Sequence, residues 1–203
     1  MHLIREKKHR FDLSLYKGEV TVSFTINVKN HLYVLNNKFI FKEFEKILLD
    51  EIGYFEENEK SVASPFTGEQ NKITSTILNG AEKPSLPLNE IKKGNNKCCS
   101  YEIPVYLFMP DHIHLILQGN NESSDVINIV NMFKQRTGYW FYQNMKNVKW
   151  QKDYYDHIIK NEQDLVNHVN YILYNPVRKE IVTDRREYKY KGSTLYNFDD
   201  WDY

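Results

Sequence analysis

Residues 110–117 read Pro-Asp-His-Ile-His-Leu-Ile-Leu, and this run decides how the chain is expected to fold. Successive side chains of a β-strand point to opposite faces, so His112 and His114 share one face of a strand over residues 112–118. The apolar residues that alternate with them point into a core: Ile113, Leu115 and Leu117. Two histidines side by side on a rigid strand form half of a metal site. The alternative is a pair of hydrogen-bonded or solvated strand histidines.

The composition predicts a soluble globular protein. The chain has 203 residues, of which 41% are apolar and 27% charged, enough for one domain with a sizeable core. No apolar run is long enough to span a membrane, and the charged residues 1–10 are not followed by the apolar stretch of a signal peptide. The only cysteines, Cys98 and Cys99, are adjacent. Because that spacing strains a disulfide, a reducing, cytoplasmic location is expected.

Charge is unevenly distributed, although the formal net charge is zero. Basic residues concentrate in residues 131–160 and 178–191, and acidic residues in 43–60. The basic half could hold a phosphate backbone, while solvated charged faces explain the pattern equally well. Aromatic residues among the lysines suit single-stranded DNA, since bases stack on rings and phosphates meet cations. The candidate DNA contacts are Lys134, Arg136, Lys149, Arg178 and Lys179.

Hydrophobic periodicity predicts three strands and three helices. The strands cover residues 19–28, 101–109 and 112–118, and the helices cover residues 37–50, 124–146 and 162–175. Asn36 or Asn37 would cap the first helix and Ser123 or Ser124 the second, while Pro176 would end the third. Two tryptophans are predicted to belong to the core, and three nearby aromatic residues to pack rather than line a site: Trp140, Trp150, Tyr154, Tyr155 and His157.

The order of these elements predicts an α+β ferredoxin-like sandwich. An antiparallel sheet would carry helices on one face, with a C-terminal helix bearing tyrosine added to it. The histidine pair would lie on the other face, open to a substrate. The polar residues 52–97, with scattered proline and glycine, are expected to be an insertion in a single domain over residues 1–203.

The last predicted helix carries a second group of polar residues. Tyr171 and Asn175 are four residues apart and share a helix face, and His168 lies on the same side. The alternative is an amphipathic helix whose tyrosine and asparagine meet solvent.

Together these motifs resemble a known family. Residues 109–117 closely resemble the HUH motif, His-hydrophobic-His, of single-tyrosine HUH endonucleases. Residues 150–157 and 171–178 look like the C-terminal pattern of REP-associated tyrosine transposases, relatives of the insertion-sequence-200-like family, and the strand after Tyr16 fits that family's first strand. Compact relatives have a short link in place of residues 52–97, so the role of this segment is open.

The resemblance implies a specific chemistry. His112 and His114 would bind a divalent metal, Mg²⁺ or Mn²⁺, that Asn175 helps to hold, and Tyr171 would be the nucleophile. Cleavage of single-stranded DNA beside a hairpin would leave a 5′-phosphotyrosine and a free 3′-OH. Zn²⁺ also suits imidazole ligands, so ligand type does not fix the metal.

Several alternatives stay open. Tyr174 is a rival nucleophile, one turn beyond Tyr171 and rotated away from it. The chain could be a domesticated, non-catalytic DNA-binding protein of the same fold, although the intact motif residues count against decay. A nucleotide hydrolase of the histidine-triad type needs a third alternating histidine where this chain has Ile116. The protein could be a monomer or a homodimer, and Tyr171 could serve its own site or a partner's.

Overall fold

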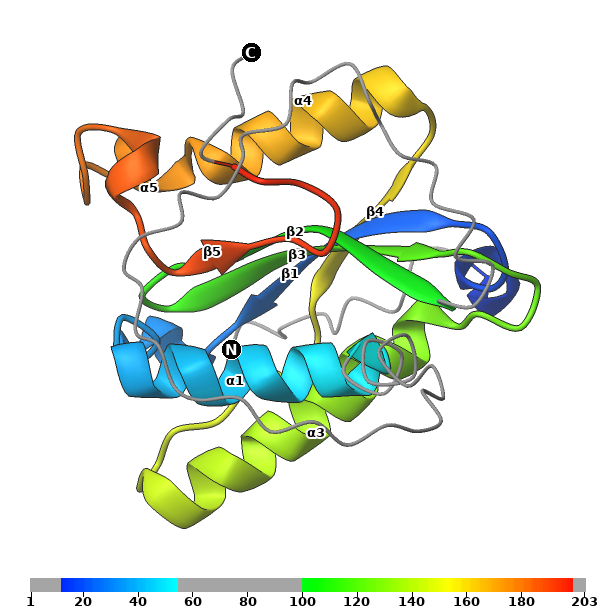
Figure 1. Cartoon of the computed structure of the whole chain (residues 1–203). Helices are drawn as coiled ribbons and strands as arrows, with labels where there is room; N and C mark the ends of the chain where they lie inside the picture. The colour runs from blue at the N-terminus through cyan, green and yellow to red at the C-terminus, as the bar shows by residue number, and fades with distance from the viewer. Residues whose placement is uncertain (1–11, 55–99, 199–203) are drawn as a thin grey trace, which may run out of the picture.

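The computed structural model describes residues 12–54 and 100–198, and one antiparallel sheet lies at its centre (Figure 1). The strand order is β4-β1-β3-β2-β5. The strands are β1 Thr21–Asn27, β2 Tyr101–Phe108, β3 His112–Gly119, β4 Tyr155–Ile159 and β5 Lys191–Gly192. The histidine strand β3 lies between β1 and β2. Backbone hydrogen bonds on both sides therefore hold its side chains rigidly.

Helices cover both faces of the sheet (Figure 1). On one face lie α1 and α3, and on the other lies α4, followed by the short α5. The helices are α1 Lys38–Glu51, α3 Val126–Asn144, α4 Glu162–Leu173 and α5 Asn175–Arg178, with short 3-10 turns at Leu13–Tyr16, Lys29–His31 and Arg185–Glu187. The predicted ferredoxin-like α+β fold is confirmed. The expectation that the histidine face lies open is wrong for Ile116 and His114, which are buried on the side of α4, whereas His112 stays partly exposed.

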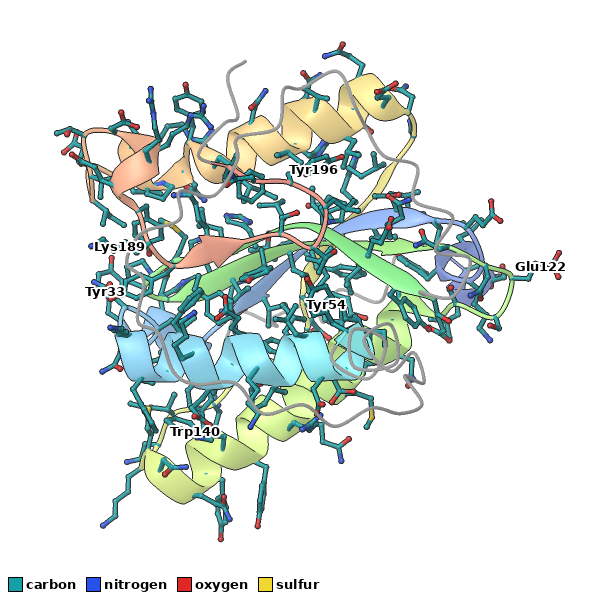
Figure 2. All side chains as sticks on the ribbon, viewed as in Figure 1. Tyr33, Tyr54, Glu122, Trp140, Lys189 and Tyr196 are labelled. Atoms are coloured by element: carbon teal, nitrogen blue, oxygen red, sulfur yellow. The ribbon has the colours of Figure 1, made fainter. Side chains whose placement is uncertain are left out.

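Alternate residues of β3 enter two different apolar layers. Three of them are fully buried beneath α1 and α3, as predicted: Ile113, Leu115 and Leu117. On the other side Ile116 packs with Val169 and Ile172 of α4. Trp140 and Tyr196 lie on opposite sides of the sheet and mark the two layers (Figure 2). His112 and His114 point to the same side of β3 as Ile116, and they therefore face α4.

The predicted core tryptophans both belong to the layer beneath α1 and α3. Trp150 is buried there and donates its indole N–H to the hydroxyl of Thr137 at 2.9 Å. Trp140 packs edge-on against Phe44, with 5.4 Å between the ring centroids. Tyr154 packs in the same way against Phe24 at 5.5 Å. Packing therefore accounts for all three rings.

Polar caps explain where the helices begin. The Asn37 side chain accepts backbone N–H groups of the first turn of α1, as predicted. Asp125 caps α3 in the same way, in place of the predicted Ser123 or Ser124. Ser124 instead donates its hydroxyl to the carbonyl of Ser100 at 2.7 Å, which fixes the loop before the helix.

Several elements differ from the prediction. The sequence pattern does not predict the strands β4 and β5, because β4 is short and has no fully buried residue and β5 has two residues. Pro176 does not end the helical segment; it lies in the first turn of α5, where its missing N–H is not needed. Cys98, Cys99 and residues 55–97 of the predicted insertion lie outside the described residues. Within the described ranges, no helix has the length and apolar character to cross a membrane.

Candidate active site

Strand β3 brings the two predicted metal ligands together. The Nε2 atoms of His112 and His114 lie 3.2 Å apart, and their rings are nearly perpendicular, with an interplanar angle of 89°. His114 is buried, with 7% of its surface exposed, while His112 is partly exposed. The pair thus forms a rigid site that is closed on one side and accessible on the other.

Hydrogen bonds at the far side of each ring fix which nitrogen faces the site. Asp111 Oδ1 lies 2.6 Å from His112 Nδ1, and Asp111 Oδ2 lies 2.8 Å from His31 Nδ1. Thr25, opposite His114 on β1, places its hydroxyl 3.1 Å from His114 Nδ1. A carboxylate only accepts, so His112 Nδ1 donates its proton to Asp111 and Nε2 is the nitrogen that faces the site. Sequence reasoning missed these supporting residues, although Asp111 directly precedes the motif.

The environment favours a charged Asp111 and a neutral His114. Burial alone would raise the pKa of Asp111, but hydrogen bonds from His112 and His31 lower it below its ordinary value. Burial, with the nearby positive charges of His112 and Arg178, lowers the pKa of His114 to about 3. A metal ligand must be a neutral imidazole, so His114 is held in the form that can coordinate.

Asn175, the third predicted metal ligand, lies against the histidine pair. It is 5% exposed, and its amide nitrogen lies 2.5 Å from His114 Nε2. The amide is therefore buried. This contradicts the alternative of an amphipathic helix whose asparagine meets solvent. A rotation of the amide by 180° exchanges this nitrogen for the oxygen, which is the atom that a divalent metal takes.

Tyr171 lies beside the histidines of its own chain. Its ring centroid is 6.4 Å from that of His114, and the side chain is 55% exposed. The guanidinium of Arg178 lies 3.8 Å over the Tyr171 ring and donates to the Tyr171 carbonyl at 3.0 Å. The rival Tyr174 instead lies 5.5 Å from the guanidinium of Arg185. Tyr171, and not Tyr174, therefore lies beside the histidine pair of the same chain.

His168 does not join this site, although it shares a helix side with Tyr171 in the sequence pattern. Its ring stacks on that of His157, with 4.5 Å between the centroids, and its Nδ1 contacts Asp164.

The donor set fits a divalent metal. The Nε2 atoms of the two histidines face each other at a hydrogen-bond distance of 3.2 Å, and a cation that both nitrogens coordinate would take the place of the shared proton. Neighbouring ligands of an octahedral ion with bonds of about 2.1 Å lie about 3 Å apart. His112, His114 and the Asn175 oxygen would fill three positions and leave the others for phosphate and water.

The predicted DNA contacts are scattered over the molecule. Arg178 and Lys179 belong to α5 and its end, beside the site. Lys134 and Arg136 lie on α3, on the opposite face of the sheet (Figure 1). Arg136 forms ion pairs with two acidic residues of α1, and Lys134 donates to two backbone carbonyls. Lys149 is exposed and, with Lys134, lines a cavity of about 680 Å³ beside α3.

Comparisons with known proteins agree with this arrangement. Residues 74–175 match the family described as "Transposase IS200 like". The chain is 29% identical over 119 residues to a putative REP-associated tyrosine transposase of Haemophilus influenzae, covering 52% of this chain and 68% of that protein. It is 33% identical over 82 residues to the REP-associated tyrosine transposase of Escherichia coli, covering 38% of this chain and 46% of that protein.

A solved structure shows the same fold. A REP-associated tyrosine transposase bound to a REP hairpin superposes with a TM-score of 0.58 at 18% sequence identity, covering 97% of this chain and 91% of that one. The family match extends over half of the sequence and includes the histidine motif, Tyr171 and Asn175. The chain therefore belongs to the IS200-like transposase family.

Proposed function

We propose that this protein is a metal-dependent strand transferase that cuts and rejoins single-stranded DNA through a covalent bond to Tyr171. The observation that carries the proposal is the convergence of His112, His114 and Asn175 with an exposed tyrosine from the same chain. A phosphodiester is anionic and resists attack, so a site that cleaves it must offset negative charge and position a nucleophile.

The residues divide this work between them. His112, His114 and Asn175 would hold Mg²⁺ or Mn²⁺, which when bound neutralises charge on a non-bridging phosphate oxygen. The Tyr171 oxygen attacks phosphorus, the bond from phosphorus to the 3′ oxygen breaks, and the phenolic proton is lost to solvent. The released 3′ oxygen takes up a proton, so the products are a 5′-phosphotyrosine and a free 3′-OH. Attack by another 3′-OH reverses the step and joins new ends.

The expected substrate is single-stranded DNA that carries a hairpin. The structural relative is bound to a REP hairpin, and basic residues at α5 lie next to Tyr171. Phosphate groups near the tyrosine would meet Arg178 and Lys179, while Lys149 would contact more distant DNA.

Formation of the covalent adduct tests this function directly. The full-length protein is incubated with a labelled hairpin oligonucleotide and Mg²⁺ or Mn²⁺, and the denatured products are separated by size. A shifted band is expected with metal and none with EDTA, and mass spectrometry of the digested adduct should locate the nucleotide on Tyr171. If the protein binds the hairpin but forms no adduct with either Mg²⁺ or Mn²⁺, the result would instead support a domesticated, non-catalytic DNA-binding protein.

Asp111→Asn should weaken metal binding at the histidines. An amide can present its nitrogen to His112 and no longer favours the protonated Nδ1, so the ring loses both orientation and basicity. The expected loss is about 10- to 100-fold in metal affinity, measured as the Mn²⁺ concentration that gives half-maximal adduct formation. His31→Asn is the matched control, because it removes only the outer partner of Asp111. Equal metal dependence in Asp111→Asn and wild type would contradict the role.

Arg178→Ala should slow adduct formation at saturating DNA by about 2- to 30-fold, because the guanidinium that holds the Tyr171 ring is lost. Lys179→Ala removes the same charge at the next position and is expected to change mainly DNA affinity. Arg178→Lys keeps the charge but not the flat stacking surface, so it should recover less than half of the loss. An unchanged saturated rate in Arg178→Ala would leave only a DNA-binding role for this residue.

A further inference from the structure

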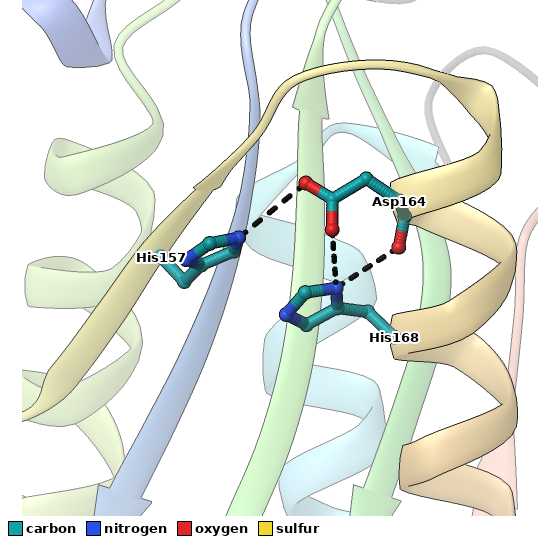
Figure 3. Close-up of side chains that lie close together, drawn as sticks. All are labelled: His157, Asp164 and His168. Carbon is teal, nitrogen blue, oxygen red and sulfur yellow. Dashed lines mark hydrogen bonds and ion pairs between the residues drawn. The ribbon is translucent and has the colours of Figure 1, made fainter.

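A second group of metal-ligating side chains joins β4 to the first half of α4. His157 projects from β4 toward Asp164 and His168 of α4 (Figure 3). We propose that these three residues form a binding site for a divalent transition metal of the Zn²⁺ class, separate from the His112 and His114 site. The proposal concerns metal binding alone and does not depend on the proposed reaction.

The three side chains are already close together. Asp164 Oδ2 lies 3.4 Å from His157 Nε2, and Asp164 Oδ1 lies 3.1 Å from His168 Nδ1. One ligand atom from each residue lies within 4.8 Å of the others. Ligands of a tetrahedral Zn²⁺ ion with bonds of about 2.1 Å lie about 3.4 Å apart. Small side-chain movements would therefore bring all three to bonding distance.

The freedom for those movements comes from exposure. The ligand nitrogens of both imidazoles face oxygen acceptors of Asp164 in the metal-free chain, and a metal would displace their protons. The two rings are stacked at an angle of 15°, so these nitrogens do not point at one centre. One ring must therefore turn for both to coordinate. The His157 side chain is 49% exposed on an edge strand, and the His168 and Asp164 side chains are 29% and 25% exposed. His157 has room to turn, and water has access to a fourth position.

The backbone of α4 positions the other two ligands. Asp164 and His168 are four residues apart and share a helix face. The Lys160 N–H donates to Asp164 Oδ2 at 3.0 Å and holds the carboxylate in place. This backbone hydrogen bond is the main reason that the pKa of Asp164 is lowered, with His157 and His168 adding to the effect. The carboxylate is thus oriented before any metal binds.

The donors of this site indicate the class of metal, and the Asp164 carboxylate adds a negative charge that the Asn175 amide does not bring to the first site. Two imidazoles and one carboxylate suit Zn²⁺, Cu²⁺, Ni²⁺ and Co²⁺, whereas Mg²⁺ prefers an oxygen shell. A bound ion would also connect the edge strand β4 to α4, the helix that carries Tyr171. Binding should therefore raise the melting temperature, since an ion that binds only the folded state stabilises it.

Zn²⁺ titration by calorimetry tests the proposal. Other candidate ligands are first removed in the full-length chain by Cys98→Ser, Cys99→Ser, His112→Ala and His114→Ala. The measurement is the number of Zn²⁺ ions bound by this protein, compared with the same protein carrying His157→Gln and His168→Gln. The expected difference is one ion per chain, accompanied by a rise in melting temperature with Zn²⁺ that the second protein lacks and that Mg²⁺ does not produce.

Two further variants separate coordination from folding. Asp164→Asn keeps an oxygen for the Lys160 N–H but loses the charge, so it should weaken Zn²⁺ binding at least 10-fold without melting the helix. Glu162→Gln removes an acid from the same helix turn and should bind Zn²⁺ as before. Equal Zn²⁺ stoichiometry with and without His157 and His168, or no Zn²⁺ bound by either protein, would overturn the proposal and leave a surface ion-pair cluster.

Discussion

Tyr171→Phe should abolish the covalent adduct with a hairpin oligonucleotide and leave DNA binding nearly unchanged. The substitution removes one oxygen from a side chain that is 55% exposed, so the expected change in the free energy of unfolding is within about 0.5 kcal/mol. Without the phenolic oxygen no phosphotyrosine can form. Denaturing electrophoresis measures the adduct, and a gel-shift titration at equal metal concentration measures binding.

Tyr174→Phe is the matched control for this result. The same atom is removed three residues away, from a ring that lies near Arg185 rather than His114. The adduct should form at the wild-type rate. If it survives in Tyr171→Phe and disappears in Tyr174→Phe, the nucleophile has been assigned to the wrong tyrosine.

His112→Ala combined with His114→Ala should remove the dependence of cleavage on metal. Both Nε2 ligands are lost, and only the Asn175 amide remains of the proposed donor set. A metal that offsets transition-state charge contributes several kcal/mol, and about 4 kcal/mol corresponds to a loss of about 1,000-fold in rate. The adduct should fall to the level of wild type in EDTA.

His157→Gln combined with His168→Gln controls for the loss of two imidazoles elsewhere. This variant should retain Mg²⁺- or Mn²⁺-dependent adduct formation, because its histidines contact Asp164 and not the Tyr171 site. Circular dichroism should show both double variants to be folded. Full metal-dependent cleavage in the His112 and His114 variant would refute the assignment of the metal ligands.

The central part of the fold could be predicted from the sequence. Strand β3 begins with histidines that alternate with apolar residues, and the period of two assigns Ile113, Leu115 and Leu117 to the core that they occupy. The spacing of Tyr171 and Asn175 correctly placed both on the side of the last helix that meets the histidines. Periodicity succeeds at these positions because burial on one face dictates the residue types.

Other parts depend on contacts that periodicity does not encode. Strand β4 has no fully buried residue, so its place at the sheet edge follows from pairing with β1 rather than from a hydrophobic pattern of its own. The burial of the histidine face follows from the docking of α4, which a search for strands and helices does not reveal. The hydrogen bonds of Thr25 and Asp111 to the imidazoles likewise come from tertiary register.

The docking of α4 on β3 has an evolutionary consequence. Side chains turn by about 100° per residue along a helix and alternate between two faces along a strand. The tyrosine of α4 and the histidines of β3 therefore meet in only one register. Deleting a single residue inside α4 would turn Tyr171 away from His114. Insertions and deletions that survive selection for DNA cleavage should therefore fall outside the segment from Val169 to Asn175.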